Sequence, residues 1–312
     1  MKCLICYEKC ETEYHESCIK SFFKTKKVPL IEYTFDELNK LSEDIIKSKI
    51  VVPGVQPKLS LHIEDTTPNR LTIIGFKGDF ILKPPTTQFK ELPENEDVTM
   101  HLAKECGLKT VPHILIKIKS GELCYLTKRI DRINNKKIHM EDFAQILEKL
   151  TEDKYKGSME KIGKAILAHS NLKGIDLIEF FEISVFSYLV GNSDMHLKNF
   201  SIIENEKGYS LAPAYDLVSV KLAMSNDTEE MALPLNGKKN KLKISDFSTF
   251  AKAISIPEKS VENSLNKFKD KKGDLIKIIN KSFLCENSKN KYIEIINQRF
   301  KIFQEWTYKY FI

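Results

Sequence analysis

The chain has 312 residues, which corresponds to about two average domains. Hydrophobic residues make up 42% and charged residues 29%, with 12 Gly and 11 Pro, and these proportions exclude a disordered, collagenous or low-complexity protein. The formal net charge of +6 is small for this length, so charge alone does not indicate a nucleic-acid binder.

No apolar stretch approaches the roughly 20 residues that span a bilayer, and the N-terminus lacks the apolar core of a secretory signal. We therefore expect a cytoplasmic protein with no membrane contact. Export from a bacterium without a standard signal peptide is the alternative.

The N-terminus is rich in cysteine, with four of the seven cysteines in the first 18 residues. The odd total does not suggest a disulfide framework. The pattern C-x2-C-x8-H-x2-C resembles two half-sites of a structural zinc centre, and its ligands would be Cys3, Cys6, His15 and Cys18. Cys10 could replace any one ligand, and a reduced, metal-free segment is an equal alternative because the loop between the pairs is short.

The next part of the chain alternates between helix and strand patterns. Apolar residues at helical spacing predict a helix over 35–47. Short strand-like segments follow at 59–63, 71–74 and 80–82, and we expect them to pair as an antiparallel meander. A helix over 95–106 and a hairpin of 114–118 with 122–129 would complete a sheet of about five strands.

The second half of the chain is mostly helical. We expect helices at 159–170, 176–190, 245–254, 258–268, 275–283 and 291–311. The segment 176–190 is apolar on nearly every side and should be the buried central helix. Strand character returns only at 200–203 and 209–211.

These patterns predict an α+β fold with two lobes. A Cys-rich segment and helix at 1–48 would precede a small antiparallel-sheet lobe with one helix at 49–135 and a larger helical lobe at 136–312. Ligands commonly bind at the interface between two lobes, so we expect the functional site there.

The segment GNSDMHLKNF, residues 191–200, carries the most chemical information. A carboxylate at Asp194 could accept the proton of a reacting hydroxyl, and an amide oxygen five residues later, at Asn199, could hold Mg²⁺. Asp216, beyond a predicted hairpin, would be the second metal ligand. This is the Asp–Asn spacing of a protein-kinase catalytic loop. Taken singly, each residue would more often cap a turn than catalyse.

The sheet lobe offers groups that could bind phosphate. Lys83 ends a predicted strand in FILKPP, where its ammonium could neutralise phosphates of ATP. Glu96 is the natural acid to orient it, with Glu94 as a competitor. The alternative is that Lys83 merely flanks a strand and that the acids merely favour a helix N-terminus.

Together and in this order, the motifs resemble the HipA-like serine/threonine kinases of bacteria. The resemblance covers about 51–220 and rests on VPGVQPKLSL, FILKPP, TKRIDR, HMEDFAQIL, GNSDMHLKNF and PAYDL. It implies a bilobal protein-kinase-like fold that uses ATP and Mg²⁺ to phosphorylate a protein serine or threonine, and also autophosphorylates. It further implies that Asp194 is the catalytic base, that Asn199 and Asp216 hold Mg²⁺, and that Lys83 binds phosphates.

The same resemblance implies a nucleotide site. The phosphates would be covered by Pro53, Gly54, Val55, Gln56, Pro57 and Lys58, the hinge would be Lys128, Arg129 and Ile130, and His196 and Tyr215 would line the site. Glu141, Asp142 and Gln145 match the family's EDFAQ stretch and should support the loop structurally.

The sequence departs from the family pattern in two places. Where many members have an autophosphorylated serine in the phosphate loop, this chain has Val51, which puts that self-inactivation in doubt. Only about 50 residues precede the kinase core, so a separate antitoxin-like or N-terminal-subdomain partner could supply the missing part.

Two other functions remain open from the sequence. The chain could be a nucleic-acid-binding regulator on an inactive kinase scaffold, using the basic run GKKNKLK at 237–243, although a solvated loop is the ordinary interpretation and direct nucleic-acid binding is not expected. It could also phosphorylate a small molecule or lipid, because the motifs describe phosphate handling and leave the acceptor open.

Overall fold

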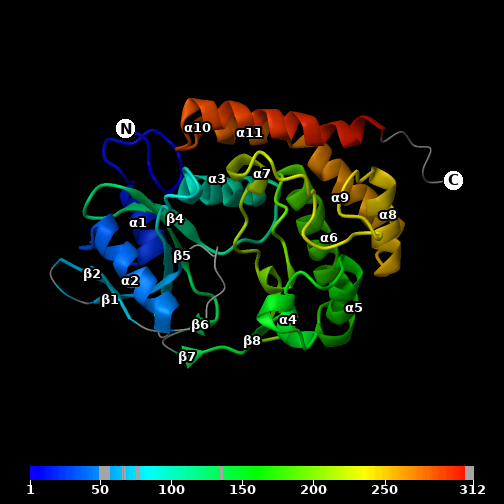
Figure 1. Ribbon diagram of the computed structural model, residues 1–312, viewed down its shortest axis with the longest axis horizontal. Helices are drawn as coiled ribbons and strands as arrows, with labels where there is room; N and C mark the ends of the chain where they lie inside the picture. Colours follow the sequence, from blue (N-terminus) through cyan, green and yellow to red (C-terminus); the bar gives the residue numbers. More distant parts are fainter. Residues whose placement is uncertain (49–56, 65, 67, 75–77, 134–135, 306–312) are drawn as a thin grey trace. The chain divides into compact units, whose positions relative to one another are not determined.

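The structure is a computed structural model that describes residues 1–48, 57–64, 66, 68–74, 78–133 and 136–305 (Figure 1). The chain divides into two compact units. The first comprises Met1–Asp97, Val111–Lys137 and Lys281–Phe283, and the second comprises Val98–Thr110, Ile138–Asn280 and Leu284–Ile312. Antiparallel sheets and many helices make the fold α+β, as predicted. The domain boundaries at 48 and 135 stay predictions.

A five-stranded antiparallel sheet forms the centre of the first unit. Its order is β2 (Arg70–Ile73), β1 (Leu59–Glu64), β3 (Phe80–Lys83), β5 (Leu123–Lys128) and β4 (His113–Lys117). The strand number is confirmed, but the predicted meander is wrong, because β1 lies between β2 and β3. Leu59 and Leu61 are fully buried in β1, whereas β2 begins with the exposed Arg70, so burial places β1 inside the sheet and β2 at its edge.

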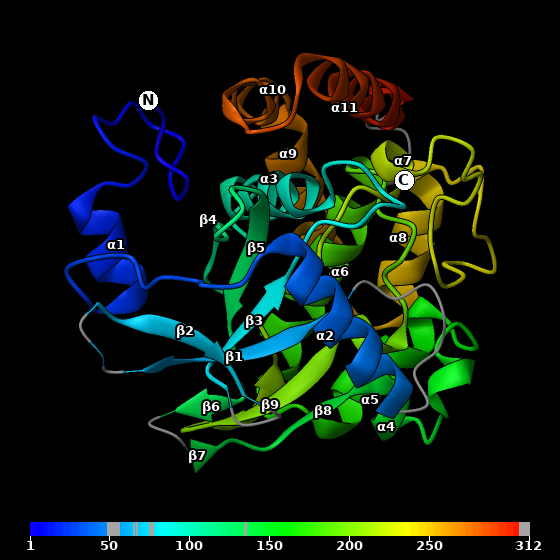
Figure 2. The ribbon, with the colours of Figure 1, turned by 60° about the vertical axis from the view of Figure 1, so that its left-hand side comes forward.

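Two helices, α1 (Glu16–Phe23) and α2 (Phe35–Ser48), lie alongside this sheet (Figure 2). Helix α1 was not predicted, because it is only two turns long. Its buried Phe22 and Phe23 join Leu38 of α2 and sheet residues such as Leu82 in one apolar core. Helices α1 and α2 therefore contribute to the first unit's core.

Both edges of the five-stranded sheet make backbone hydrogen-bond contacts with the N-terminal segment. At β2, the Leu71 amide donates to the Leu30 carbonyl at 2.8 Å, and the Leu30 amide donates to the Asn69 carbonyl at 2.9 Å. At β4, the Leu115 amide donates to the Leu4 carbonyl at 3.3 Å.

Helix α3 (Leu92–Glu105) links the two units in sequence. It begins earlier than predicted, since Pro93 is tolerated in a first helical turn, where its missing N–H costs no hydrogen bond. The helix includes Asn95–Asp97 of the first unit and continues into the second.

The second unit contains the expected long helices. They are α5 (Met159–His169), α6 (Lys173–Leu189), α8 (Ile244–Ala253), α9 (Glu258–Asp270), α10 (Lys272–Lys281, whose last residue counts with the first unit) and α11 (Glu286–Arg299). The helix predicted over 291–311 begins earlier, at Glu286, and continues beyond Arg299 as a 3-10 helix at Phe300–Glu305; its residues 306–311 lie outside the described residues. Helix α6 is the buried central helix, as predicted: Phe180 contacts the rings of Phe200 and Phe250, and most of the helix is buried.

A second sheet, of order β10-β9-β8, comprises β8 (Met140–Asp142), β9 (Ser201–Asn205) and β10 (Gly208–Leu211). The β9–β10 hairpin is as predicted, whereas β8 was missed because a three-residue strand carries no readable period. Shorter elements are β6 (Arg132–Ile133), β7 (Lys136–Lys137), α4 (Phe143–Ile146) and α7 (Val220–Ala223). Within the described residues, no helix is both long and apolar enough to cross a bilayer.

Candidate active site

Lys83 and Glu96 form a buried ion pair in the first unit. The Lys83 ammonium lies 2.5 Å from a Glu96 carboxylate oxygen, and the two side chains are 4% and 3% exposed. The ammonium also lies 5.3 Å from the centre of the Tyr125 ring. Strand β3 supplies the lysine and α3 supplies the acid, as the sequence predicted. Burial of a charged pair costs desolvation energy, so the arrangement is more typical of a functional site than of a strand end.

Glu94, the competing acid, lies in a different environment. Burial raises the pKa of Glu94 to about 7. The structure thus selects Glu96 as the partner of Lys83, because only Glu96 has the ammonium within bonding distance.

The predicted hinge residues lie at the end of β5. The amide of Lys128 donates to the Pro112 carbonyl at 3.0 Å, and the amide of Arg129 donates to the Asp79 carbonyl at 2.9 Å. Two of the three expected hinge amides are therefore used within the unit, and a nucleotide-binding role of these residues stays a prediction. The guanidinium of Arg129 is paired with Asp131 at 2.6 Å.

The predicted phosphate-covering loop is described only in part. Pro57 and Lys58 precede β1, and the side chain of Lys58 is exposed. Pro53, Gly54, Val55 and Gln56 lie outside the described residues.

The second unit brings Asp194, His196 and Asn199 together on the loop that follows α6. The Asn199 amide nitrogen donates to the Asp194 carbonyl at 2.9 Å, which fixes the loop and leaves the amide oxygen as a possible metal ligand. His196 Nε2 lies 4.0 Å from Asp194 Oδ1. The Asp194 side chain is 45% exposed whereas that of His196 is 7% exposed, so the carboxylate can meet a substrate from solvent.

Tyr155 was not predicted as a site residue. Its hydroxyl donates to Asp194 Oδ1 at 2.5 Å, and its ring meets His196 edge-on with centroids 5.0 Å apart. Burial, and next the negative charge of Asp194, raise the pKa of the Tyr155 hydroxyl, so it stays protonated and remains a donor. Tyr155 lies 39 residues before Asp194, and no local pattern in the sequence links the two.

Tyr215 and Asp216 follow β10 in the same unit. The Tyr215 hydroxyl donates to the Lys198 carbonyl at 3.1 Å and shares a hydrogen bond with Ser201 at 2.5 Å, which ties the segment before Asp216 to the loop of Asn199. Asp216 has a φ of 57°, in the left-handed region that is uncommon for residues other than glycine. Such backbone outliers cluster at functional sites.

The EDFAQ stretch supports this loop, as expected. Asp142 caps α4 through a capping box with Gln145, and its second carboxylate oxygen accepts from the Lys198 ammonium at 2.7 Å. Strand β8 also pairs with β9, with Glu141 opposite Ile202. The stretch is thus fixed to both ends of the loop between Lys198 and Ile202.

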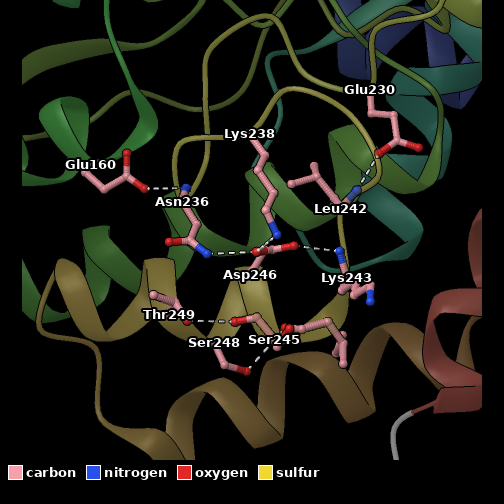
Figure 3. A network of polar contacts seen from close by, with 11 residues as sticks. Glu160, Glu230, Asn236, Lys238, Leu242, Lys243, Ser245, Asp246, Ser248 and Thr249 are labelled. Atoms are coloured by element: carbon pink, nitrogen blue, oxygen red, sulfur yellow. Dashed lines mark hydrogen bonds and ion pairs between the residues drawn. The ribbon is translucent and has the colours of Figure 1, made fainter.

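Two lysines of the basic run at 237–243 pair with nearby acids, and Figure 3 shows the contacts of Lys238. The buried Asp246 accepts from the Lys238 ammonium at 2.8 Å and from the Asn236 amide at 2.7 Å, while Lys239 pairs with Glu229 at 3.2 Å. These bonds, with the Lys243 amide, lower the pKa of Asp246 despite its burial. The contacts favour a structural loop over a phosphate-binding surface.

The predicted zinc ligands also converge. Cys3, Cys6, His15 and Cys18 each place one ligand atom within 4.8 Å of the others. All seven cysteines of the chain are free thiols.

Comparisons with known proteins agree with this geometry. A family model described as "HipA-like C-terminal domain" matches residues 50–274. The chain is 33% identical over 224 residues to "Putative kinase Y4dM" of Sinorhizobium fredii, which is 67% of this chain and 54% of that protein. It is 33% identical over 184 residues to a "Putative kinase" of Haemophilus influenzae, which is 54% of this chain and 52% of that protein. The chain thus spans about half the length of these curated relatives.

Two solved structures show the same fold. HipA of Shewanella oneidensis, solved with HipB and its operator DNA, matches with a TM-score of 0.70 and 20% identity over 88% of this chain and 72% of that chain. The Helicobacter pylori proinflammatory kinase CtkA matches with a TM-score of 0.51 and 17% identity over 73% of this chain and 89% of that chain. The protein-kinase-like fold predicted from the sequence is therefore confirmed.

Proposed function

The chain belongs to the family of the HipA-like C-terminal domain, a family whose members are named as kinases, and from this premise we propose that it is an ATP- and Mg²⁺-dependent serine/threonine protein kinase. The observation that carries the proposal is that the chain holds both kinds of group that phosphotransfer needs, one kind in each unit. The first unit has the buried Lys83–Glu96 pair, and the second has Asp194 and Asn199 on one hydrogen-bonded loop.

In this proposal, Asp194 orients the acceptor hydroxyl and takes its proton as the phosphoryl group leaves ATP. Its exposed carboxylate can reach a protein side chain, while the Tyr155 hydroxyl holds Oδ1 in place. Asn199 and Asp216 offer the amide and carboxylate oxygens that Mg²⁺ prefers, and Mg²⁺ would neutralise charge on the transferred phosphate. Lys83 would bind the remaining phosphates, held in position by Glu96.

The test is phosphorylation with radiolabelled ATP, followed by phosphoamino-acid analysis of the enzyme and of a generic protein substrate. We expect phosphoserine or phosphothreonine, and a loss of label of about 10²-fold or more in Asp194→Asn, since general-base catalysis contributes about 10²–10⁴-fold. Asp274→Asn is the matched control, because Asp274 is a partly exposed acid that pairs with Lys277 one helical turn further along α10. Equal labelling by Asp194→Asn and the control would contradict the assignment.

The acceptor distinguishes this proposal from a small-molecule or lipid kinase. Label that enters low-mass material from a cell extract, with none in protein, would favour the latter. The regulator on an inactive scaffold is disfavoured by the local pairing of Lys238 and Lys239. Duplex binding that survives Asp194→Asn with a steep salt dependence would support it instead.

We also propose an antitoxin-like protein partner. The support is that the HipA of Shewanella oneidensis was solved with HipB. Co-purification with the product of a neighbouring gene would test this, and the partner should raise the apparent melting temperature of the chain by mass action.

A further inference from the structure

The N-terminal segment places three sulfur atoms and one imidazole nitrogen around a common point. The atoms of Cys3, Cys6, His15 and Cys18 lie within 4.8 Å of one another. Nδ1 of His15 is 3.3 Å from Cys6 Sγ and 3.9 Å from Cys18 Sγ. Tetrahedral zinc with Zn–S bonds of about 2.3 Å places sulfur atoms about 3.8 Å apart. The four side chains therefore need only small inward movements to become a coordination shell.

The second nitrogen of His15 supports a ligand role for the first. Nε2 lies 3.0 Å from the Lys9 carbonyl oxygen. A carbonyl can only accept a hydrogen bond, so Nε2 must carry the proton, and in the neutral ring the lone pair is then on Nδ1. That lone pair belongs to the atom beside the Cys6 and Cys18 sulfurs. Metal-bound histidines are typically oriented by such a bond to a backbone carbonyl.

The structure also decides between the cysteines. Cys10, which the sequence left as a possible replacement for any ligand, has its Sγ 3.9 Å from Thr12 Oγ1 and is not part of the four-atom cluster. Cys3 is fully buried, so the cluster reaches into the protein and does not sit on a surface loop.

The backbone around the first cysteine pair is folded tightly. The Cys3 amide donates to the Glu8 carbonyl at 2.9 Å, and the Tyr7 amide donates to the Cys3 carbonyl at 3.0 Å. Tyr7 adopts a left-handed φ of 66°, which is a strained conformation for an aromatic residue. A cross-link at Cys3 and Cys6 would offset this strain in a segment too short to build a core of its own.

We propose that Cys3, Cys6, Nδ1 of His15 and Cys18 bind one structural Zn²⁺. The three thiols would release their protons to solvent and bind as thiolates, and the neutral imidazole would complete a closed tetrahedral S₃N site. Closed four-ligand sites are structural and have no open position for a substrate.

The site would also stabilise the Lys83–Glu96 pair, and this part rests on the proposed function. Tyr7, next to Cys6, donates its hydroxyl to a carboxylate oxygen of Asp97 at 2.5 Å. The other carboxylate oxygen of Asp97 lies 2.8 Å from Nδ1 of His113, and all three side chains belong to the first unit. Asp97 follows Glu96 in α3, so the zinc-bound turn would fix the helix segment that orients Lys83.

The first experiment needs only the full-length protein, purified without a polyhistidine tag under reducing conditions. Elemental analysis should find one zinc per chain, and zinc K-edge absorption spectra should fit three sulfurs at about 2.3 Å and one nitrogen at about 2.0–2.1 Å. Cys10→Ser is the matched control and should keep the full zinc content, whereas Cys18→Ser should lose it. Reduced protein without zinc above the buffer level, or a zinc shell of nitrogen and oxygen only, would overturn the proposal even if Cys18→Ser does not fold.

The second experiment separates the zinc site from the proposed kinase activity. Tyr7→Phe should keep the zinc but raise amide hydrogen exchange in residues 95–97 about tenfold or more, because the hydrogen bond to a carboxylate is lost. Hydrogen exchange is independent of phosphotransfer, so it remains informative if the protein is not a kinase. Unchanged exchange in Tyr7→Phe with zinc retained would refute the link to α3 and leave the zinc site itself intact.

Discussion

The buried pair of Lys83 and Glu96 allows stability and activity to be separated. Removing one partner leaves the other charge buried without its counter-ion, which costs about 3–5 kcal/mol. The pair belongs to this range because both side chains are almost completely buried and their charged atoms are 2.5 Å apart. Replacing both by methionine removes both charges at similar volume, and such replacements are often neutral or stabilising.

We therefore expect Lys83→Met and Glu96→Met each to destabilise the first unit by about 3–5 kcal/mol, and the double variant to recover most of that loss. Activity should behave differently. All three variants should lose phosphotransfer, because the double variant restores packing but not the ammonium that would bind phosphate.

Hydrogen exchange of β3 and of residues 92–97 of α3 reports the stability of the first unit, and radiolabel transfer reports activity. A double variant that regains phosphotransfer together with stability would refute the reasoning, since the pair would then serve the fold alone. Single variants that cost less than about 1 kcal/mol would show that the charges are better solvated than the structure indicates.

Three further predictions address other parts of the chain. Tyr155→Phe should lower kcat/KM about tenfold because Asp194 loses a charge-assisted hydrogen bond, whereas the exposed Tyr209→Phe should leave kcat/KM unchanged, as steady-state kinetics would show. Burial raises the pKa of Glu94 from 4.5 to about 7, so the free energy of unfolding should fall as pH rises through this window. In urea unfolding, Glu94→Gln should therefore be more stable than the parent by about 1–3 kcal/mol at pH 8 but not at pH 4. In thermal unfolding, Gly163→Ala should lower stability by about 1–3 kcal/mol, because the new methyl group would lie 2.3 Å from Ile254. Gly273→Ala, at a helix position with open space around it, should be neutral or stabilising in the same assay.

The sequence predicted the elements better than their arrangement. Helix α6 and the β9–β10 hairpin were found because their apolar patterns are long or clearly bounded, whereas α1 and β8 are too short to show a period. The meander was wrong because consecutive strands are usually but not always neighbours, and here β3 pairs with β1 instead of β2.

For the site, the sequence predicted the residue types but not the contacts that hold them. Glu96 could be named as the partner of Lys83 because helix phase and strand end were both readable. Tyr155 could not, since its contact with Asp194 joins positions 39 residues apart with no shared motif. Cys10 likewise could be excluded as a metal ligand only from the three-dimensional structure, because the sequence spacing alone permits several ligand sets.

The hydrogen bonds of Leu4 and Leu30 to opposite borders of the five-stranded sheet have a consequence for self-association. An uncovered border strand presents free amides and carbonyls to any other chain, and natural proteins prevent such strand addition by covering it. Here one stretch of the same polypeptide covers both sides. The N-terminal segment should therefore protect the folded molecule from strand addition at both borders, so that linear aggregates could grow only after this segment detaches.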